Sequence, residues 1–458
     1  MDTKKLRQKI LDLAIMGKLV PQDPNDEPAS VLLERIRAEK ERLISEGKIK
    51  RPKKSKATSS ESHYQNFEPP FEIPNSWEWC QVEDIFELNP KNSVSDTSLC
   101  GFIPMALVQD GFGFSHSYER RVWRDVKKGY SHFQNGDIGI AKISPCFENR
   151  KSTIFYGLPN GIGAGTSELT ILRPIVVDAE FYLFLFQSIW YITEGTKDFT
   201  GVVGQQRVNK EIFTSLVIPI PPIAEQKRIT TEIKRYFHFV ELIEYNKETL
   251  IRNTLTTKSK ILELAMQGKL VPQDPADEPA TEMLKRINPN AKIITDNPHY
   301  PKLPYNWVYV ALEDIVDYEQ PQPYIVNDTT YSNAYATPVL TAGQSFIVGD
   351  TNEVNGIYSK LPVIIFDDFT TDSRIIDFPF KVKSSAMKIL SVKEGINIQY
   401  VGTFMSITRL IGDTHKRYWI SEYSKLLIPL PPIAEQTRII EAIRIFTSNL
   451  DSIQRNLN

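Results

Sequence analysis

The sequence predicts a mixed α/β (α+β) protein, built as a circular pseudo-two-fold repeat of two β-rich blocks separated by long helical segments. Three observations support this fold class. A long stretch at the middle of the chain contains neither Pro nor Gly, two sets of motifs occur twice, and related short motifs open two blocks that otherwise differ.

The central helix is the element around which the chain is organised. Residues 223–267 lack Pro and Gly, so one helix of up to ~67 Å can form there. Pro221 and Pro222 suit the start of a helix, and Gly268 suits its end. Apolar residues with heptad spacing predict a partner helix, and they are Ile229, Ile233, Tyr236, Val240, Ile243 and Leu250. The alternative is an ordinary buried helix, because the clear seam lasts only about three heptads.

Repeated motifs predict where the partner helix comes from. Residues 218–226 (IPIPPIAEQ) return at 428–436 as IPLPPIAEQ, and residues 17–24 (GKLVPQDP) return at 268–275. The segment DEPA likewise occurs at 26–29 and at 277–280. Residue 458 therefore corresponds to 248 and residue 1 to 252, so the two ends of the chain together repeat the central helix. Their expected seam residues are Leu6, Ile10, Leu13, Ile439, Ile443, Phe446, Leu450, Ile453 and Leu457.

Composition excludes several classes of protein. Lys and Arg (54) nearly balance Asp and Glu (56), giving a net charge of −2, so any DNA binding has to come from local patches. The three cysteines, Cys80, Cys100 and Cys146, lack CxxC spacing and indicate reduced thiols in the cytoplasm. No apolar run reaches the ~18 residues of a membrane span.

The N-terminal segment contains two predicted helices and a polar stretch. The first helix ends at Gly17, and a charged helix follows from Ala29 to about Glu46. Residues 47–62 carry six Lys or Arg before a Ser-rich end. We interpret this stretch as a solvated linker, with contact to a DNA backbone as the alternative.

The two β-rich blocks share their opening motifs but not their middles. Residues 73–77 (IPNSW) and 82–85 (VEDI) match residues 303–307 (LPYNW) and 312–315 (LEDI). Short β-rich runs follow in each block, at 138–143, 169–172, 363–366 and 387–390, and then one apolar helix, at 180–193 and at 397–407. Trp123 and Tyr191 are expected in the core. We expect the blocks to do the same job on different targets.

The patterns that signal catalysis or a metal site are missing. The sequence has no GxxxxGK[ST], HExxH or Gly-x-Ser-x-Gly, and its six His are scattered. Residues 144–147 (SPCF) faintly resemble the Asp/Asn/Ser-Pro-Pro-aromatic loop of DNA amino-methyltransferases, but the second Pro and a glycine-rich cofactor loop are absent. Asp367, Asp368 and Asp372 are interpreted as loop or strand-edge carboxylates. We therefore expect a chain without catalytic activity, metal or cofactor.

The paired IPxPPIAEQ and GKLVPQDP segments, in circular order around two variable blocks, resemble the specificity subunits of type I restriction–modification systems over nearly the whole chain. The resemblance implies two α/β target-recognition domains held apart by a pair of long antiparallel conserved helices, each domain reading one half of a bipartite site in double-stranded DNA. It also implies two methyltransferase subunits docked on these helices, and motor–endonuclease subunits that complete the restriction enzyme. S-adenosylmethionine, ATP and Mg²⁺ would belong to those partners.

The resemblance and the repeats together predict five regions. They are residues 1–66, the N-terminal part of the split helical region with a linker; 67–221, the first target-recognition domain; 222–298, the central helical region; 299–431, the second target-recognition domain; and 432–458, the C-terminal part of the split helical region.

Residues that contact DNA are expected where polar clusters interrupt apolar runs, because base edges are read by side-chain donors and acceptors. The candidates in the first domain are Lys142, Ser144, Asn149, Arg150, Lys151, Thr166, Ser167, Gln205, Gln206 and Arg207. Those in the second are Thr341, Gln344, Ser373, Arg374, Lys383, Ser384, Ser385, His415, Lys416, Arg417 and Tyr418. Arg207 and Arg417 occupy matching positions just ahead of the repeated IPxPP segments, where the family has a polar loop that faces DNA. The alternative for every cluster is an exposed, solvated loop.

Two other classes of protein stay open. One is a coiled-coil scaffold that binds proteins, and the other is a DNA methyltransferase in its own right. Sequence-selective DNA binding that needs a methyltransferase partner favours the specificity subunit, whereas methyl transfer by the isolated chain favours the enzyme.

Overall fold

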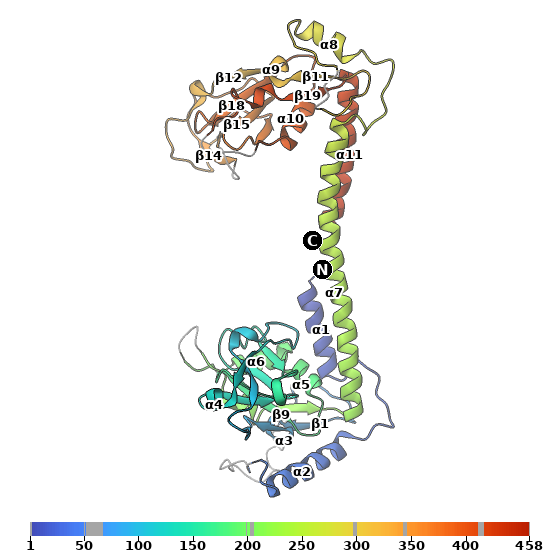
Figure 1. The fold of residues 1–458 in the computed structure, drawn as a ribbon, viewed down its shortest axis with the longest axis vertical. Coiled ribbons are helices and arrows are strands. Elements are labelled where there is room, and N and C mark those ends of the chain that lie inside the picture. The colour runs from blue at the N-terminus through green and yellow to red at the C-terminus, as the bar shows by residue number, and fades with distance from the viewer. Residues whose placement is uncertain are drawn as a thin grey trace. The chain divides into compact units, whose positions relative to one another are not determined.

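The computed structural model describes residues 2–49, 51, 67–197, 199–201, 206–295, 300–341, 346–410 and 416–457 (Figure 1). They form two compact units, Met1–Asn246 and Lys247–Asn458. Each unit contains one β-rich block, and helix α7 (Ile223–Met266) belongs in part to both units. The stretch interpreted as a linker, residues 47–62, lies mostly outside the described residues.

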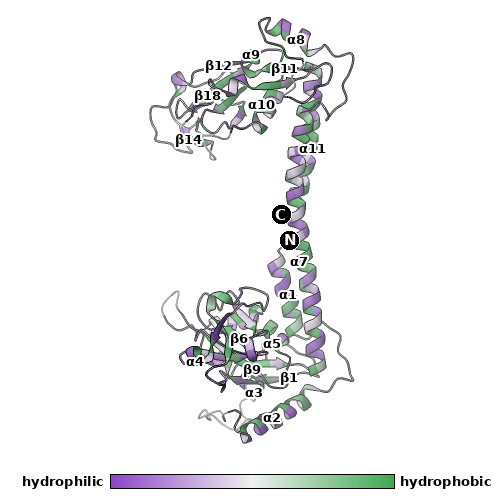
Figure 2. Cartoon of the chain, in the orientation of Figure 1, coloured by the Kyte–Doolittle hydropathy of each residue, from purple (hydrophilic) through white to green (hydrophobic). Residues whose placement is uncertain are grey.

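Helix α7 is a single helix of 44 residues, as the absence of Pro and Gly predicts. It begins directly after Pro222, and its end is closed by a hydrogen bond of 2.9 Å from Lys269 N–H to the Leu264 carbonyl. Gly268 has a φ of +64°, the left-handed conformation that this type of helix end requires. Figure 2 shows hydrophobic and hydrophilic residues alternating along α7, as expected of an amphipathic helix.

In the first unit, helix α1 (Thr3–Ile15) runs antiparallel to α7. The Arg7 guanidinium donates to both carboxylate oxygens of Glu244 at 2.8 Å, and beyond the other end of α1 Arg228 donates to Asp26 at 2.6 Å. The buried apolar residues of the two helices are Ile10, Leu11, Ala14, Ile15, Ile229, Ile233, Phe237 and Val240. A second helix, α2 (Ala29–Ser45), follows the turn after α1.

In the second unit, helix α11 (Ile433–Leu457) lies along the C-terminal part of α7 in the same way. Arg438 donates to Asp277 at 2.6 Å, the repeat counterpart of the Arg228–Asp26 contact, and Lys258 forms an ion pair with Asp451. Helix α8 (Ala280–Ile287) follows the turn after α7.

The heptad seam of α7 is interrupted near its middle. Ile243 and Leu250 were expected in the seam, but 36% and 41% of their surfaces are exposed. Thr254 is buried although it is polar, and its hydroxyl donates to the Leu250 carbonyl at 2.8 Å. Among the described helices, none combines the length and the apolar content needed to cross a membrane.

Both β-rich blocks contain the same four-stranded antiparallel sheet. In spatial order the first has strands β2 (Phe86–Leu88), β9 (Leu169–Pro174), β6 (Ile138–Ala141) and β7 (Ser152–Ile154). The second has strands β12 (Val316–Glu319), β18 (Met387–Val392), β15 (Val363–Asp367) and β16 (Ser373–Ile376). The strands correspond one to one in chain order and in space, so the two blocks share a topology.

A second sheet and a two-stranded ribbon complete each block. The second sheet of the first unit has strands β4 (Glu119–Val122), β3 (Leu99–Ile103), β8 (Ile162–Gly165) and β5 (Ser131–Gln134), with β3 and β8 parallel. That of the second unit has strands β14 (Ile347–Thr351), β13 (Thr337–Leu340) and β17 (Lys381–Val382), with β13 and β17 parallel. The ribbons pair β1 (Glu78–Gln81) with β10 (Val217–Ile220), and β11 (Val308–Ala311) with β19 (Leu427–Leu430).

The prediction of a single apolar helix at residues 180–193 is wrong. The chain forms two helices there, α5 (Ala179–Phe186) and α6 (Ile189–Thr196), because the Ser188 hydroxyl caps α6 by accepting from Tyr191 N–H at 3.2 Å. The second block has one helix, α10 (Ile398–Ile407), as predicted. The core positions expected for Trp123 and Tyr191 are confirmed, since both are buried. Shorter helices and turns are α3 (Val82–Ile85), α4 (Trp123–Val126), α9 (Leu312–Ile315), η1 (Met105–Leu107), η2 (Pro159–Gly161), η3 (Lys210–Phe213), η4 (Gln322–Tyr324) and η5 (Tyr423–Lys425).

The repeated Glu-Gln pair forms the joint between each block and its helices. Gln226 accepts from Asp178 N–H and donates to the Pro221 carbonyl, both at 2.8 Å, and Gln436 makes the matching bonds to Asn397 and Pro431 at 2.9 Å. The Glu residues that precede them accept from the Gln side chains of the two GKLVPQDP segments, at 2.6 and 3.2 Å. The repeated motifs are therefore framework, and the same contacts are built twice.

Candidate nucleic-acid interface

Three chain segments meet at one end of the four-stranded sheet of the first unit. They are the β6–β7 turn, the β8–β9 turn and the segment before η3. Lys142 N–H donates to the Glu168 carbonyl at 3.0 Å, and Ser144 N–H donates to the Gln206 carbonyl at 2.8 Å. We call residues 142–144, 166–168 and 206–208 recognition edge 1.

Six of the predicted residues lie on recognition edge 1. They are Lys142, Ser144, Thr166, Ser167, Gln206 and Arg207. Arg207 is exposed, and its Nε and Nη2 atoms donate to the Glu168 carboxylate at 3.0 and 2.8 Å. These hydrogen bonds lower the pKa of Glu168 and raise that of Arg207, so the two side chains form an ion pair at neutral pH.

The other three predicted residues of the β6–β7 turn make contacts within the unit. Arg150 donates to the Gln187 carbonyl at 2.8 Å and to Gln8 of α1 at 3.1 Å, and its guanidinium lies 4.8 Å from the centre of the Phe112 ring. Lys151 is 3.2 Å from the Asp110 carboxylate, and Asn149 is exposed. Arg150 therefore packs this end of the turn against α1.

The corresponding segments meet in the second unit. Asp368 N–H donates to the Ala386 carbonyl at 3.0 Å, and Tyr418 N–H donates to the Asp368 carbonyl at 2.9 Å. Lys383 N–H donates to the Leu340 carbonyl at 2.8 Å. Thr341, the residue after Leu340, is therefore next to the same segments. We call residues 341, 368–374, 383–386 and 416–418 recognition edge 2. It contains the predicted residues Thr341, Ser373, Arg374, Lys383, Ser384, Ser385, Lys416, Arg417 and Tyr418.

The residues of recognition edge 2 divide into exposed and buried groups. Arg374 is exposed with its guanidinium 4.5 Å from the centre of the Phe346 ring, and Arg417 is exposed with Nη2 3.4 Å from Ser385 Oγ. Lys416 is paired with Glu422. Ser373 and Tyr418 are buried, so their side chains lie beneath the exposed residues. Three further candidates, Gln205, Gln344 and His415, lie outside the described residues.

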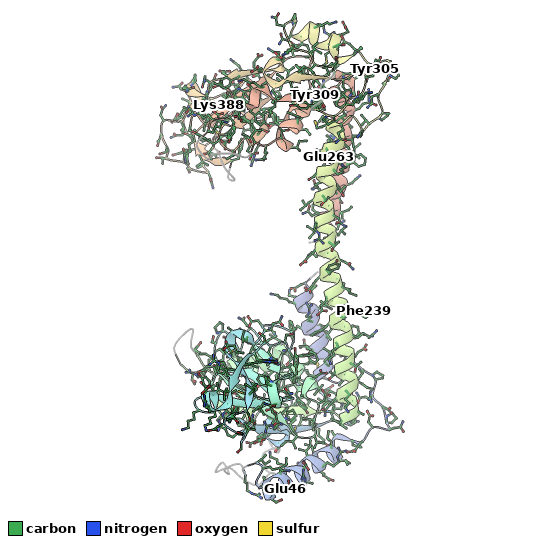
Figure 3. The ribbon with its side chains drawn as sticks, in the orientation of Figure 1. Glu46, Phe239, Glu263, Tyr305, Tyr309 and Lys388 are labelled. Atoms are coloured by element: carbon green, nitrogen blue, oxygen red, sulfur yellow. The ribbon has the colours of Figure 1, made fainter. Side chains whose placement is uncertain are left out.

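A buried ion pair that was not identified in the sequence supports recognition edge 2. Lys388 lies on β18 (Figure 3). Its Nζ is 3.3 Å from the Asp368 carboxylate, and each of the two side chains is only 3% exposed. Asp368 Oδ1 also accepts from Trp419 N–H at 2.7 Å, directly beyond Arg417 and Tyr418. The signal in the sequence is a Lys inside an apolar strand, since a buried cation needs a buried anion.

Asp367 and Asp372 also bind neighbouring groups. Asp367 accepts from Phe369 N–H at 3.0 Å, and Asp372 pairs with Arg409 at 2.7 Å. Within the described residues, no group of three or more His, Cys, Asp and Glu is placed to hold a metal ion.

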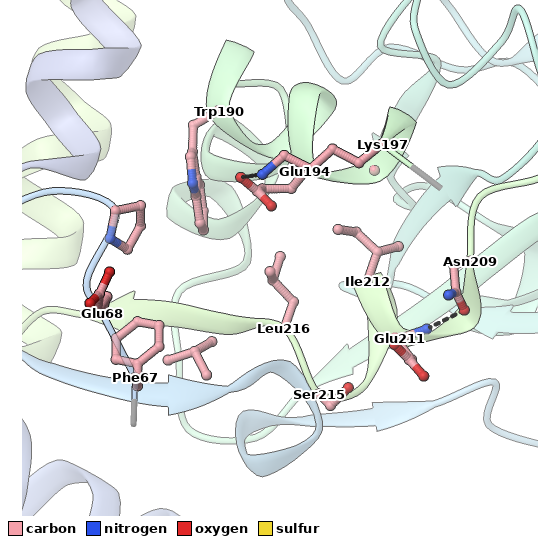
Figure 4. A pocket seen from close by; sticks show the side chains of 13 residues that line it. Phe67, Glu68, Trp190, Glu194, Lys197, Asn209, Glu211, Ile212, Ser215 and Leu216 are labelled. Atoms are coloured by element: carbon pink, nitrogen blue, oxygen red, sulfur yellow. Dashed lines mark hydrogen bonds and ion pairs between the residues drawn. The ribbon is translucent and has the colours of Figure 1, made fainter. Parts of the chain in front are cut away.

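The first unit also has a pocket of about 500 Å³ beside η3 and the start of β10 (Figure 4). Phe67, Trp190 and Leu216 form its apolar wall, and Lys197 pairs with Glu194 at 2.6 Å. The described residues that line this pocket include no His and no Cys, the residue types that most often act as base or nucleophile.

Comparison with known proteins identifies the family. A family model described as "Type I restriction modification DNA specificity domain" matches residues 127–253. The chain is 34% identical to the specificity subunit of the type I restriction enzyme EcoAI of Escherichia coli over 95% of this chain and 87% of that protein. It is 39% identical to the EcoEI specificity subunit of Escherichia coli over 68% of this chain and 62% of that protein.

Two solved structures share the fold. The HsdS subunit from Thermoanaerobacter tengcongensis matches with a TM-score of 0.57 and 15% identity, over 85% of this chain and 93% of that one. A chain from a structure on complex assembly and conformational transition of the type I R-M system matches with a TM-score of 0.59 and 15% identity, over 85% of this chain and 94% of that one.

The identity and coverage of the relatives confirm the predicted function of a DNA specificity subunit, and the two solved structures confirm the mixed α/β fold class. The members of this family are subunits without catalytic activity and without a cofactor of their own, as we expect of this chain. The chain belongs to the DNA specificity subunits of type I restriction–modification complexes.

Proposed function

We propose that recognition edge 1 and recognition edge 2 each read one half of a bipartite site in double-stranded DNA. The observation that carries this proposal is that one strand topology places three chain segments together in both units, with different side chains on each edge. A common framework with different exposed donors suits two half-sites of different sequence, because base edges are distinguished by their pattern of donors and acceptors.

The helices α1, α7 and α11 are proposed to set the distance between the half-sites and to dock two methyltransferase subunits. Exposed apolar residues support the docking role, since water-exposed apolar surface is typical of protein interfaces. In the first unit they include Phe239, which lies on α7 (Figure 3), and Tyr245, which is 62% exposed. In the second unit they include Ile445 of α11 and also Phe446, for which the predicted seam position is wrong because 46% of its surface is exposed.

The further partners follow from the same proposal. Motor–endonuclease subunits would join the methyltransferase complex in the cytoplasm, and S-adenosylmethionine, ATP and Mg²⁺ would bind to these partners. The target-recognition domains would span residues 67–221 and 299–431. The helical regions would be 1–66 (with the linker), 222–298 and 432–458.

Exchange of one recognition domain tests the proposal. Replacement of residues 67–217 by the matching block of another specificity subunit should change one half-site and leave the other half-site and the spacer unchanged. The matched control replaces residues 308–427, and it should change only the other half-site. Methylation sequencing of cells that carry each hybrid with the methyltransferase subunit gives both half-sites directly. A change of both half-sites in either hybrid would contradict the modular function.

A further inference from the structure

Glu168 holds Arg207 in a fixed orientation on recognition edge 1. The Nε and Nη2 atoms of Arg207 donate to the two carboxylate oxygens of Glu168 at 3.0 and 2.8 Å. Both residues are also held through the backbone, because the Glu168 carbonyl accepts from Lys142 and Arg207 exchanges two hydrogen bonds with Thr200, at 2.8 and 3.1 Å. A bidentate pair of this kind fixes the plane of the guanidinium.

The pair leaves one edge of the guanidinium available. An Arg side chain has five N–H donors in a planar fork, and Glu168 takes one from Nε and one from Nη2. The donors that remain lie on Nη1 and on the far side of Nη2. Two parallel donors of this kind match the O6 and N7 acceptors of guanine in the major groove.

The carboxylate of Glu168 also makes a phosphate an unfavourable partner for Arg207. The pair carries no net charge, and a phosphate that approached Arg207 would be repelled by Glu168. A base edge carries no such charge. Arg417 occupies the matching place on recognition edge 2, and its contacts there are with neutral groups, the Ser385 hydroxyl at 3.4 Å and the Phe369 ring, whose centre is 5.7 Å from the guanidinium.

We propose that Glu168 is a specificity-determining residue that holds Arg207 for reading a base edge and keeps it from binding phosphates without regard to sequence. This role rests on the proposed function, because it requires recognition edge 1 to face DNA. Glu168 acts through Arg207, so its removal should alter the balance between selective and non-selective binding.

The variant Glu168→Ala, in the full chain assembled with the methyltransferase subunit of the same system, tests this role. Binding is measured as a function of salt on two duplexes, one with the target mapped by methylation sequencing of the wild type and one without it. Arg207 should then bind a phosphate, so the log–log salt dependence on both duplexes should steepen by about 0.9. Discrimination at one base pair of the first half-site should fall by about tenfold. The second half-site should not change.

Two further variants separate charge from positioning. Glu168→Gln keeps an oxygen that can accept from Arg207 but removes the charge, so it should steepen the salt dependence and retain more of the base selectivity than Glu168→Ala. Glu27→Ala removes the carboxylate that accepts from Nη1 of Arg35, an exposed Arg–Glu pair elsewhere in the first unit, and should change neither quantity.

Unchanged salt dependence and unchanged base selectivity in Glu168→Ala, in a complex that still melts at the wild-type temperature, would overturn the role of Glu168 and leave the proposed function intact. Equal weakening on both duplexes would also overturn it. A wild-type complex that binds the two duplexes equally would overturn the proposed function itself.

Discussion

At the scale of the residue, Arg207 and Arg417 show how one framework position can carry different chemistry. Both are exposed, and each contacts the turn that leads into an inner strand of the four-stranded sheet. The partner is a carboxylate in the first unit and a hydroxyl in the second. Because a charged partner orients and neutralises the guanidinium and a hydroxyl does not, the two arginines differ in the orientation and the charge of the donors that they expose.

Arg417→Ala should weaken binding to the bipartite target by about 1–3 kcal/mol and relax the choice at one base pair of the second half-site, because a donor pair to a base edge is lost. Binding titrations on the target and on its single-base variants measure both effects. Arg286→Ala serves as the control, because Arg286 of α8 is an exposed Arg of the same unit that is paired with Glu278, which precedes the helix. Unchanged affinity and unchanged site choice in Arg417→Ala would contradict a role in DNA recognition and favour the alternative, an exposed residue of a solvated loop.

The Asp368–Lys388 pair shows why recognition edge 2 keeps its shape. Both side chains are almost fully buried, so the loss of one would leave an uncompensated charge in the interior. The pair binds the backbone of the segment that carries Arg417, through Trp419 N–H. The buried ion pair therefore holds the backbone next to Arg417, whose side chain is exposed.

At the scale of the element, the lowered pKa of Glu244 predicts that the packing of α1 on α7 depends on pH. The hydrogen bonds from Arg7 lower the pKa of Glu244 from 4.5 to about 2. A carboxylate with a lowered pKa in the folded state stabilises the fold above its unfolded pKa, and this contribution is lost as the pH falls from about 4.5 through about 2. The contribution is modest, because 38% of the Glu244 side chain is exposed and water screens the charge.

Glu244→Gln should therefore loosen α1 at pH 6 and make little difference at pH 2. Amide hydrogen exchange over residues 5–15, expressed as the ratio of the rates in variant and wild type at each pH, measures this effect. The ratio should exceed one at pH 6 and approach one as the pH falls. Glu34→Gln, at an exposed position on α2, should give a ratio near one throughout. A ratio for Glu244→Gln that is independent of pH would contradict the role of the carboxylate charge.

At the scale of the whole molecule, α7 is the only described element that belongs to both units. An α-helix has a fixed rise and rotation per residue, so an insertion in α7 adds a known rise and a known rotation to this helix. Each unit has its own copy of the repeated framework contacts, and an insertion near the middle of α7 removes none of these residues. Such an insertion therefore tests the helix specifically.

Insertion of four residues next to Thr249 should lengthen the unread spacer by one base pair. The insertion adds ~6 Å of rise and ~40° of rotation beyond a full turn, whereas each base pair of DNA adds ~3.4 Å and ~35°. We expect rotation to decide, because both domains have to face the same side of the duplex. Methylation sequencing reads the spacer directly.

The control is a four-residue insertion after Gly47, outside α7, which should leave the spacer unchanged. Full activity with an unchanged spacer in the α7 variant would show that this helix does not set the distance.

The sequence predicted the features that depend on local pattern and on repetition. The absence of Pro and Gly over residues 223–267 was sufficient for α7, since nothing in that stretch interrupts helical hydrogen bonds. The offsets between the repeats predicted that the two ends of the chain supply the partner helices of α7, and the family resemblance implied that they run antiparallel to it. The break between α5 and α6 was missed because an apolar run does not reveal that Ser188 caps a new helix.

Amino-acid pattern alone thus determined the circular repeat, the long helix, the type of each block and the family, because these follow from spacing along the chain. Only the tertiary structure decided which polar residues share an edge. It grouped Arg207 with Glu168 across 39 positions, and it turned Arg150 toward Gln8 of α1 although Arg150 is close in sequence to Ser144. The physical reason is that sheet pairing brings together turns that are far apart in the chain, and neighbours on one turn can face opposite ways.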